Sequence, residues 1–597
     1  MSKLVNVKIN GILVQVPEGT TILEAAKKLN IVIPTLCYHS DLSIAGNCRV
    51  CVVEVKNSKT LQPACAYPVA EGMEIYTNSQ TVRQARKHII ELLLSEHDAD
   101  CTRCYRNGRC ELQNLAYEYA ATENGNGFIK LINFKNYKKD FSSPSIVKDD
   151  TRCVKCQRCV RTCEELQGVS ALTVAFKGEH LKISTFFDHP LLNVVCTNCG
   201  QCVSHCPTGA LIEKTNIDEV LAAIDDPTKF VVVQTAPSTR VALGEWLGLE
   251  PGAIVVGKMV KALRLLGFDS VLDTDFSADL TIIEEGHELL NRLKKAILLK
   301  EKVALPMFTS CSPGWIKFIE HMYPDMLENL STCKSPQQMF GAVAKTYYAQ
   351  KIGVDPKNMV VVSIMPCTAK KFEANRPEMN SSGYQDVDYV LTTRELAKMI
   401  KQAGIDFTRL EESEYDSILG KSTGAGVIFG ATGGVMEAAL RTAYEVVTGK
   451  SVPFTNLNIQ PVRGLDGIKE ATIKIDGTKD EWKFLEGVEL KVAIAHGLAN
   501  AKKLIEAIRA GKVNYHFVEI MACPGGCLAG GGQPIPVDNE IRRKRMTSIY
   551  KIDENMPLRK SHENPEIIQL YQEFLKEPNG HLSHELLHTH YTPRKRY

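Results

Sequence analysis

One cysteine pattern that occurs twice restricts the fold of this chain more than any other feature. Each copy reads C-x2-C-x2-C-x3-C, and Pro207 follows the second copy where Glu164 follows the first. The copies consist of Cys153, Cys156, Cys159, Cys163 and of Cys196, Cys199, Cys202, Cys206. In doubled runs of this kind, the fourth cysteine binds the cluster of the other run. The pattern therefore predicts two 4Fe-4S clusters. Their expected ligands are Cys153, Cys156, Cys159, Cys206 for one and Cys196, Cys199, Cys202, Cys163 for the other.

Two further sets of ligand residues precede this pattern. The first has spacings of 10, 2 and 13 residues and consists of Cys37, Cys48, Cys51 and Cys65. It fits a 2Fe-2S cluster, although its spacing differs from the plant type, and structural zinc is the alternative. The second set follows residues 82–96, whose apolar positions recur at helical spacing. It consists of His97, Cys101, Cys104 and Cys110. One histidine and three cysteines also suit zinc, but the neighbouring motifs favour a 4Fe-4S cluster.

The composition agrees with metal sites rather than disulfides. Of the 20 cysteines, 15 lie before residue 207, and nothing at the N-terminus resembles a secretion signal. Lys and Arg number 71 against 69 Asp and Glu, so the chain lacks the excess charge typical of proteins that bind nucleic acid or an anionic membrane. No stretch of about 18 consecutive apolar residues occurs. We expect a cytoplasmic protein with no nucleic-acid or membrane partner.

The pattern of apolar residues indicates several small folds in series. Residues 3–17 alternate around Asn10-Gly11, which predicts a β-hairpin, and ILEAAKKL predicts a helix after it. From residue 213 to about 540, the runs FVVVQTA, NMVVVSIM and GVIFGA read as buried strands, and RELAKMIKQ reads as a helix. This alternation predicts an α/β domain with a largely parallel sheet.

Three cysteine-containing segments follow apolar runs of that domain. They are TSCSPGW, MPCTAKKFE and EIMACPGGCLAGGGQP. Because the carboxyl ends of parallel strands are where such folds build sites, we expect the three segments to meet. The glycines from Gly525 to Gly532 allow backbone to approach a bulky group, which favours a cofactor over packing alone.

Taken together, these motifs resemble the FeFe (iron-only) hydrogenases, in particular the clostridial and NADP-reducing type with an extended N-terminal cluster region. The resemblance covers nearly the whole chain, including the tail with KSHENPEIIQLYQEFL and HELLHTHY. It implies a multidomain protein of α+β and α/β folds. The implied domains are a β-grasp ferredoxin-like 2Fe-2S domain (1–78), a 4Fe-4S domain with one His and three Cys ligands (79–140), a bacterial two-4Fe-4S ferredoxin-like domain (141–212), an α/β H-cluster catalytic domain (213–540) and a helical small-subunit-like tail (541–597).

The resemblance also implies an H-cluster, which is a 4Fe-4S cubane joined to a di-iron unit with carbonyl, cyanide and a dithiolate amine bridge. Its expected protein ligands are Cys367, Cys523 and Cys527, the last bridging to the di-iron unit. Other expected cofactor contacts are Lys370, Pro237, Ser238, Met365, Phe429, Met521 and Gln337. The expected proton path consists of Cys311, Glu285, Glu288, Ser331 and Arg292. Without the resemblance, the two glutamates and the arginine would read as a solvated helical face.

The segment TSCSPGW departs from the family's usual TSCCPGW, because Ser312 stands where the fourth cubane ligand is expected. A serine hydroxyl is a harder and less acidic ligand than a thiol. Three arrangements are open: Ser312 binds iron, Cys311 binds instead and gives up proton transfer, or the cubane keeps three ligands. A further thiol, Cys333, lies close in sequence to the expected proton path.

The expected activity is reversible reduction of protons to H2, with electrons relayed through the N-terminal clusters. No GxGxxG motif at the start of a βαβ unit is present, so we expect separate flavin- and NAD(P)-binding subunits, ferredoxin, or both as electron partners. The resemblance further implies H-cluster maturation proteins as partners and the catalytic subunit of an NAD(P)-linked, electron-bifurcating complex. A hydrogen or redox sensor of low activity and an iron-sulfur assembly protein are the alternatives.

Elemental analysis and EPR test the predicted cluster content. The 16 upstream ligands, 15 Cys and His97, form four sets of four, which predicts one 2Fe-2S and three 4Fe-4S clusters before the H-cluster. We expect iron, sulfide and the EPR signals of the reduced protein to match this total. Zinc at the His97 set, or only two 4Fe-4S signals from the first 212 residues, would contradict the prediction.

Overall fold

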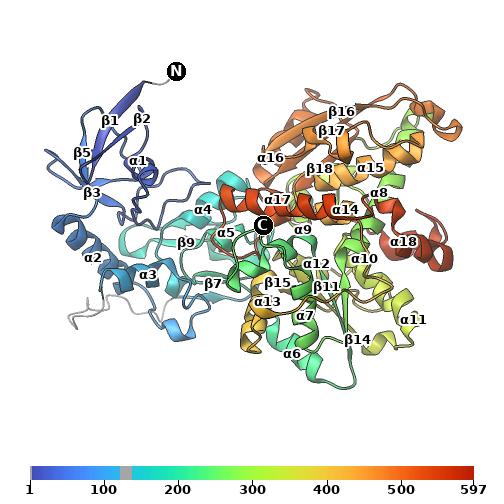
Figure 1. Ribbon diagram of the computed structural model, residues 1–597, viewed down its shortest axis with the longest axis horizontal. Coiled ribbons are helices and arrows are strands. Elements are labelled where there is room, and N and C mark those ends of the chain that lie inside the picture. Colours follow the sequence, from blue (N-terminus) through green and yellow to red (C-terminus); the bar gives the residue numbers. More distant parts are fainter. Residues whose placement is uncertain (1–2, 122–136, 597) are drawn as a thin grey trace. The chain divides into compact units, whose positions relative to one another are not determined.

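The computed structural model describes residues 3–121 and 137–596 (Figure 1). Residues 122–136, which fall within the expected domain 79–140, lie outside the described part. The chain forms two compact units. The first comprises residues 1–165, 170–191 and 205–212, and the second comprises residues 166–169, 192–204 and 213–597.

The first unit begins with a five-stranded sheet in the order β2-β1-β5-β3-β4. Its strands are β1 (Leu4–Ile9), β2 (Ile12–Pro17), β3 (Val52–Val55), β4 (Gln62–Pro63) and β5 (Glu74–Tyr76). The predicted hairpin is confirmed: Ile9 pairs with Ile12, and Asn10 and Gly11 both have the positive φ that a two-residue turn requires. Helix α1 (Ile22–Lys28) follows, and the Thr21 side chain accepts a hydrogen bond from the Glu24 N–H at its start.

The rest of the first unit is built from short elements around the cysteine motifs. They include α2 (Gln80–Ser95), α3 (Glu111–Glu118), β6 (Lys139–Asp140), β7 (Ile146–Asp149), α4 (Arg158–Arg161), β8 (Thr173–Ala175) and β9 (Lys182–Ser184). Helix α2 confirms the helix expected from the spacing of residues 82–96, and Ser79 caps it. The elements α5 (Gln201–His205) and β10 (Leu211–Glu213) span the sequence positions where the chain changes unit.

The second unit contains two four-stranded sheets, β12-β11-β14-β15 and β13-β18-β17-β16. Their strands are β11 (Phe230–Thr235), β12 (Ser270–Asp273), β13 (Met307–Phe308), β14 (Met359–Met365), β15 (Tyr389–Thr392), β16 (Ile468–Lys474), β17 (Glu489–His496) and β18 (Phe517–Met521). All pairings are parallel except that of β16 with β17. The predicted α/β fold with parallel buried strands is therefore confirmed.

Helices cover both sheets of the second unit (Figure 1). They are α6 (Ile217–Asp225), α7 (Val256–Leu265), α8 (Thr274–Leu293), α9 (Pro313–Met322), α10 (Pro336–Val343), α11 (Ala349–Ile352), α12 (Ala369–Ala374), α13 (Thr393–Gln402), α14 (Gly424–Ile428), α15 (Gly434–Thr448) and α16 (Leu498–Arg509). Helix α13 confirms the helix predicted for RELAKMIKQ. The run GVIFGA was expected to be a strand, and this expectation is wrong, because it forms the fully buried α14 and the turn after it. Periodicity cannot separate a short apolar strand from a buried helical turn.

Helix α8 lies at the centre of the second unit. It packs against α10, α14 and α15, and nearly all of its first 17 residues are buried. Asp275, Asp279, Glu284 and Glu285 are each at most 2% exposed on this helix. The alternative reading of these residues as a solvated helical face is therefore wrong for Glu285.

The C-terminal residues form a mostly helical segment on the second unit. Its helices are α17 (Asn539–Asn555), α18 (Pro565–Leu570) and α19 (His581–Leu587). Asp553 of α17 accepts hydrogen bonds at 2.9 Å from both Arg441 terminal nitrogens, and both side chains are fully buried. This ion pair joins α17 to α15.

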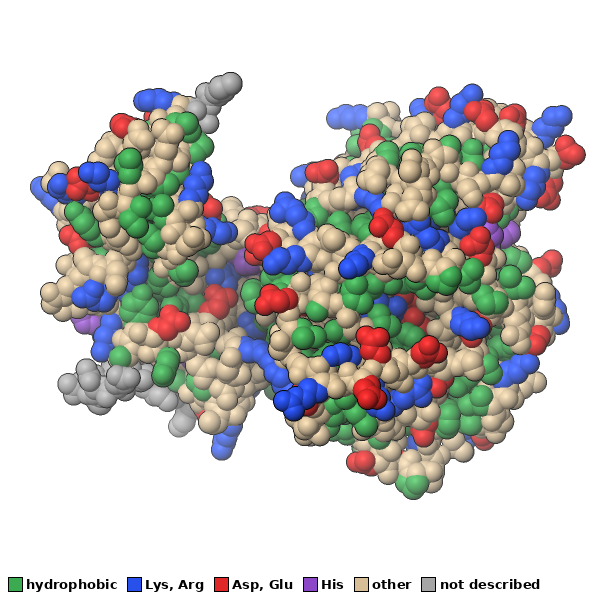
Figure 2. Space-filling view, viewed as in Figure 1, with side chains coloured by type: hydrophobic (Ala, Val, Ile, Leu, Met, Phe, Trp, Pro, Cys, Tyr) green, Lys and Arg blue, Asp and Glu red, His purple; other side chains and the backbone are tan. Residues whose placement is uncertain are grey.

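The surface of the second unit carries charges of both signs. On the face drawn in Figure 2, acidic and basic side chains of the second unit are interspersed. Within the described residues, no helix is long and apolar enough to span a membrane.

The Arg441–Asp553 pair should make a large contribution to stability. We expect Asp553→Ala to lower the free energy of unfolding of the second unit by about 3 kcal/mol, because the buried Arg441 guanidinium is left with Glu437 as its one carboxylate among the described residues and Arg559 also loses its carboxylate partner. The three tryptophans, Trp246, Trp315 and Trp482, all lie in this unit, so tryptophan fluorescence during urea unfolding reports on it.

The matched control is Asp325→Ala, which removes the half-exposed Arg509–Asp325 pair. We expect less than about 1 kcal/mol from that change, since exposed ion pairs contribute little. Equal effects of the two substitutions would contradict a structural role for the buried pair.

Candidate active site

Three strand ends bring the cysteine segments of the second unit together, as predicted. TSCSPGW follows β13, MPCTAKKFE follows β14, and the segment with Cys523 and Cys527 follows β18. One cavity is lined by all three segments and by the residue after β11. The predicted site residues on its wall are Cys311, Ser312, Cys367, Cys523, Cys527, Lys370, Pro237, Met365, Phe429, Met521 and Gln337.

The cavity suits a large, soft cofactor. Its volume is about 790 Å³ when the space open to solvent is included, and its wall is largely apolar with several thiols. Burial raises the pKa of the Cys367 thiol, and it raises that of the Cys527 thiol to about 12. Thiols held this way lose their protons readily only to a metal. The residues present therefore fit an iron-sulfur cubane with an attached di-iron unit.

Polar groups on the wall are few and fixed. The Lys370 ammonium donates hydrogen bonds to the Glu373 carboxylate at 2.8 Å and to the Cys311 carbonyl at 3.2 Å. The amide nitrogen of Gln337 donates to Glu373 at 3.1 Å, whereas its buried oxygen has no hydrogen-bond partner among the described residues. A buried oxygen that lacks a hydrogen-bond donor and lies beside a cavity is typical of a site that holds a ligand or cofactor. Ser238 lies behind the wall, where its hydroxyl donates to the Cys527 carbonyl at 3.2 Å.

Both residues of the altered segment face the same cavity. Ser312 is the residue before α9, and its hydroxyl oxygen accepts a hydrogen bond from the Ala522 N–H at 3.2 Å. Burial, and then the negative charge of Glu285, raises the pKa of the Cys311 thiol well above its usual value. Because Cys311 and Ser312 both line the cavity, all three ligand arrangements remain open.

The residues predicted for the proton path lie close together beside α8. The Ser331 hydroxyl donates to the Glu288 carboxylate at 2.8 Å, and Arg292 donates to the same carboxylate at 2.7 Å. Glu285 is also hydrogen-bonded to Ser331, and burial raises its pKa to about 8. A carboxyl group with such a pKa can both give and accept a proton near neutral pH. Cys311 interacts electrostatically with Glu285, so the order along the path is Cys311, Glu285, Ser331, Glu288 and Arg292.

The C-terminal segment holds this path in place, which the sequence did not reveal. His588 pairs with Cys333 in an antiparallel β-bridge, and the Thr589 N–H donates to the Thr332 carbonyl at 2.7 Å. The Tyr591 hydroxyl donates to the Ser331 carbonyl at 2.8 Å.

Side chains extend the contact between the C-terminal segment and the path. Nδ1 of His588 is 2.7 Å from the Thr332 hydroxyl, and its Nε2 is 3.2 Å from the carboxylate of Glu284. The Thr332 N–H in turn donates to Glu288 at 3.0 Å. These contacts join residues that are far apart in the sequence, and no local sequence motif predicts them.

The first unit gathers two of the predicted cluster ligand sets. Among Cys37, Cys48, Cys51 and Cys65, thiol hydrogen bonds lower the pKa of Cys37 and Cys51 and raise the pKa of Cys48 and Cys65. Because Cys37 is hydrogen-bonded to Cys48 and Cys65, and Cys51 to Cys65, the four sulfurs lie close together. A second cavity is lined by Cys153, Cys156, Cys159 and Cys206, the set predicted for one 4Fe-4S cluster.

The His97 set also shows features of a metal site. His97 is 6% exposed, its Nδ1 has no hydrogen-bond partner in the part of the chain that the structure describes, and burial lowers the pKa of its imidazole to about 4. The ring is therefore neutral at pH 7, as a metal ligand must be. A Cβ added to Gly209 would lie 2.6 Å from the Cys104 sulfur, so glycine leaves room there for a thiolate and its cluster. Cys163 belongs to the first unit, whereas Cys196, Cys199 and Cys202 belong to the second, and their shared cluster stays a prediction.

Comparison with known proteins identifies the cavity of the second unit. The family "Iron only hydrogenase large subunit, C-terminal domain" matches residues 229–531, which contain all three cysteine segments and the residues predicted for the proton path. The chain belongs to the iron-only hydrogenase family. Its tail matches "Iron hydrogenase small subunit" over residues 539–594. Residues 2–80, 86–124 and 143–212 match a 2Fe-2S domain, an NADH-ubiquinone oxidoreductase-G iron-sulfur region and a ferredoxin-like domain, respectively.

Individual hydrogenases resemble the whole chain. It is 50% identical to the "NADP-reducing hydrogenase subunit HndD" of Solidesulfovibrio fructosivorans, covering 99% of this chain and 100% of that protein. It is 41% identical to "Iron hydrogenase 1" of Clostridium pasteurianum, covering 98% and 99%. A solved structure, "Stepwise [FeFe]-hydrogenase H-cluster assembly revealed in the structure of HydA(deltaEFG)", is 48% identical with a TM-score of 0.58. It matches 64% of this hydrogenase chain and 99% of its own.

Substitutions at Cys311 and Ser312 distinguish the open ligand arrangements. If Ser312 binds iron, Cys311→Ala should lower turnover by about 10²- to 10⁴-fold, as loss of a proton-transfer group does, and should keep the H-cluster infrared and EPR spectra. If Cys311 binds iron, the same variant should lose the cluster itself.

Ser312→Cys provides the reciprocal measurement. We expect a thiolate in place of oxygen to raise the reduction potential of the cubane, since a softer ligand stabilises the reduced iron. Unchanged activity together with an unchanged potential would show that Ser312 has no role at the cluster.

Proposed function

We propose that this chain is an FeFe hydrogenase that interconverts two protons, two electrons and H2. The observation that carries the proposal is the meeting of a thiol-lined cavity with a buried path of acids. Cys311 lies on the cavity wall, and the carboxylates of Glu285 and Glu288 follow it away from the cavity. An assembly protein that only handles iron-sulfur clusters has no need of such a path.

In this proposal, the H-cluster supplies the metal at which protons and electrons combine. Cys367, Cys523 and Cys527 would hold the cubane. Lys370 would donate a hydrogen bond to a cyanide, and the backbone N–H of Ser238, which follows Pro237, would donate another. The side chains of Met365, Phe429 and Met521 exclude water from the cavity. The side-chain nitrogen of Gln337 donates hydrogen bonds to the Glu373 carboxylate and to the Lys370 carbonyl, and these bonds orient its buried side-chain oxygen.

Protons move along side chains of this protein. Cys311 would exchange a proton with the cavity and with Glu285, whose raised pKa of about 8 suits transfer in both directions. Ser331 would pass the proton between the two glutamates through its hydroxyl. Arg292 stabilises the charged form of Glu288, and its bonds to the carbonyls of Glu328 and Leu330 fix the outer end of the path.

Electrons would reach the cavity through one 2Fe-2S and three 4Fe-4S clusters on the ligand sets predicted above. The domain boundaries proposed for this arrangement are 1–78, 79–140, 141–212, 213–540 and 541–597, with a β-grasp fold for the first. The order of the sheet β2-β1-β5-β3-β4, with α1 packed on β2, supports that fold.

The electron partners are inferred from the relatives. A relative named an NADP-reducing hydrogenase subunit suggests that this chain works beside flavin- and NAD(P)-binding subunits, with ferredoxin as a further donor and electron bifurcation as one mode of operation. Assembly of the H-cluster would require maturation proteins. We infer a cytoplasmic location because the same relative is named as reducing NADP.

An assay of H2 evolution on the full-length protein, matured with its di-iron cofactor, tests the proposed function. We expect turnover with a reduced viologen dye, and a loss of about 10²- to 10⁴-fold in Glu285→Gln, because the amide cannot relay a proton. The infrared spectrum of the H-cluster should be unchanged in this variant, since Glu285 does not line the cavity.

The control is Glu411→Gln, which replaces an exposed glutamate of the same unit and should leave turnover unchanged. A matured protein that carries the H-cluster spectrum but produces no H2 would favour the sensor alternative.

A further inference from the structure

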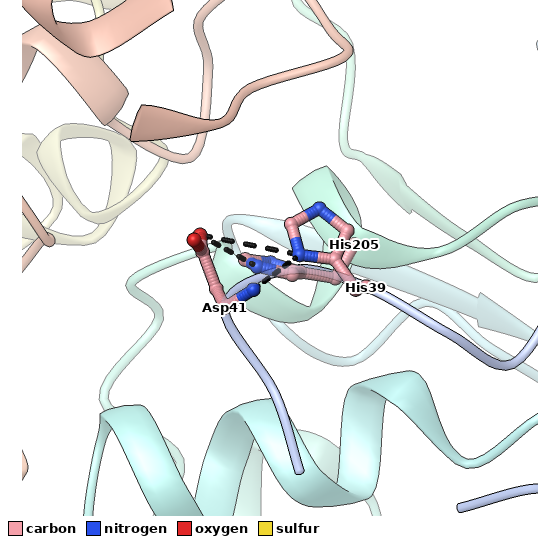
Figure 3. Close-up of side chains that lie close together, drawn as sticks. All are labelled: His39, Asp41 and His205. Carbon is pink, nitrogen blue, oxygen red and sulfur yellow. Dashed lines mark hydrogen bonds and ion pairs between the residues drawn. The ribbon is translucent and has the colours of Figure 1, made fainter. Parts of the chain in front are cut away.

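Two histidines and an aspartate of the first unit converge at a place that the proposed hydrogenase function does not use. His39 and Asp41 lie on the loop after Cys37, and His205 precedes Cys206 (Figure 3). Their side chains are 16%, 7% and 2% exposed, respectively. One potential ligand atom from each residue lies within 4.8 Å of the others.

The distances between these groups are those of ligands around an ion rather than of direct hydrogen bonds. Oδ2 of Asp41 is 3.7 Å from Nε2 of His205 and 4.0 Å from Nδ1 of His39. Direct bonds of this type are about 2.7–3.2 Å long. Zinc bonds of about 2.0–2.2 Å in tetrahedral geometry place ligand atoms about 3.4 Å apart. Small shifts of the three side chains would therefore surround an ion.

The orientations of the rings agree with this geometry. The two ring centroids are 4.4 Å apart and the planes are tilted by 56°, so the rings do not stack in parallel. In Figure 3, one nitrogen of each ring points toward the Asp41 carboxylate. Nδ1 of His39 accepts a hydrogen bond from the Asp41 N–H at 3.2 Å, so this nitrogen is unprotonated, and a bound ion would take its lone pair in place of the amide.

The charges on the loop permit a cation. Arg161 donates to the carbonyls of Cys37 and Ser43, and the Glu165 carboxylate accepts from the Ser43 N–H at 2.8 Å. With Asp41, the loop and its contacts thus combine two negative charges and one positive charge. Two neutral imidazoles and a carboxylate are a common ligand set for zinc and other divalent transition metals.

We propose that His39, Asp41 and His205 form a binding site for a divalent transition-metal ion, with zinc as the best-matched ion. The ion would join the loop that carries Cys37 to the residue beside Cys206. It would thereby fix a ligand of the 2Fe-2S set against a ligand of a 4Fe-4S set. Its positive charge would also raise the reduction potentials of clusters held by these two cysteines, because added positive charge favours the reduced state.

The test uses the full-length protein, purified without oxygen and with its iron complete. After treatment with a mild chelator, the protein is equilibrated with zinc sulfate, and bound zinc and iron are measured by elemental analysis. We expect the wild type to bind zinc, and Asp41→Asn and His205→Gln to bind it at least tenfold more weakly at equal iron content. His189→Gln, which changes an exposed histidine of the same unit, should bind zinc as the wild type does.

Two further measurements decide the outcome if a variant loses iron. His205→Asp keeps a metal ligand and should retain zinc, and zinc should raise the potential of the 2Fe-2S EPR signal in the wild type but not in Asp41→Asn. The proposal is overturned if the wild type with complete iron binds no zinc, if Asp41→Asn binds it equally well, or if His205→Asp does not retain it. None of these readouts depends on H2 turnover, so failure here leaves the proposed hydrogenase function untouched.

Discussion

The second unit depends on the burial of a helix that carries many carboxylates. An unpaired carboxylate in a protein interior costs several kcal/mol, so each acid of α8 needs its own partners. Asp275 and the preceding Asp273 pair with Arg240 at 2.9 and 2.8 Å. Asp279 accepts hydrogen bonds from Thr423 and from Asn564 of the C-terminal segment. These partners come from distant parts of the chain, and they hold the surrounding elements at fixed positions around α8.

The same requirement explains why a path for protons can exist inside this unit. Glu284 accepts hydrogen bonds from the Tyr571 hydroxyl and the Asn579 N–H at 2.8 Å, and it lies 3.2 Å from Nε2 of His588. Burial acts to raise its pKa, but these contacts lower it below the usual value. Glu285 has fewer partners, and burial together with the charge of Glu288 keeps its pKa high. Adjacent residues of one helix thus have opposite properties, because one faces the C-terminal segment and the other faces Ser310 and Ser331. The two adjacent acids thus differ in pKa because of their surroundings alone, and the raised pKa of Glu285 is what its proposed role requires.

The sequence allows prediction of those features that have a local signal. The doubled cysteine motif, the Asn10-Gly11 hairpin and the strand ends before the three cysteine segments all follow from spacing or turn chemistry. The helical conformation of α14 could not be predicted, because its short apolar run fits a buried strand equally well. The contacts of His588, Thr589 and Tyr591 with residues 331–333 could not be predicted either, since more than 250 residues separate the partners. The roles of Cys311 and Ser312 depend on which atom meets iron, and their adjacent positions on one cavity wall leave that choice to experiment.

The bridge between residues 587–591 and residues 331–334 has a consequence for the order in which this unit is completed. A chain is synthesised from its N-terminus, so the cysteine segments and both glutamates are made before the residues that hold Ser331 in place. Until Thr589 and Tyr591 are synthesised, the carbonyls of Thr332 and Ser331 lack the donors that they have in the folded unit. The surroundings of Ser331 and Glu288 are therefore complete only after residues more than 250 positions further along the chain have been added.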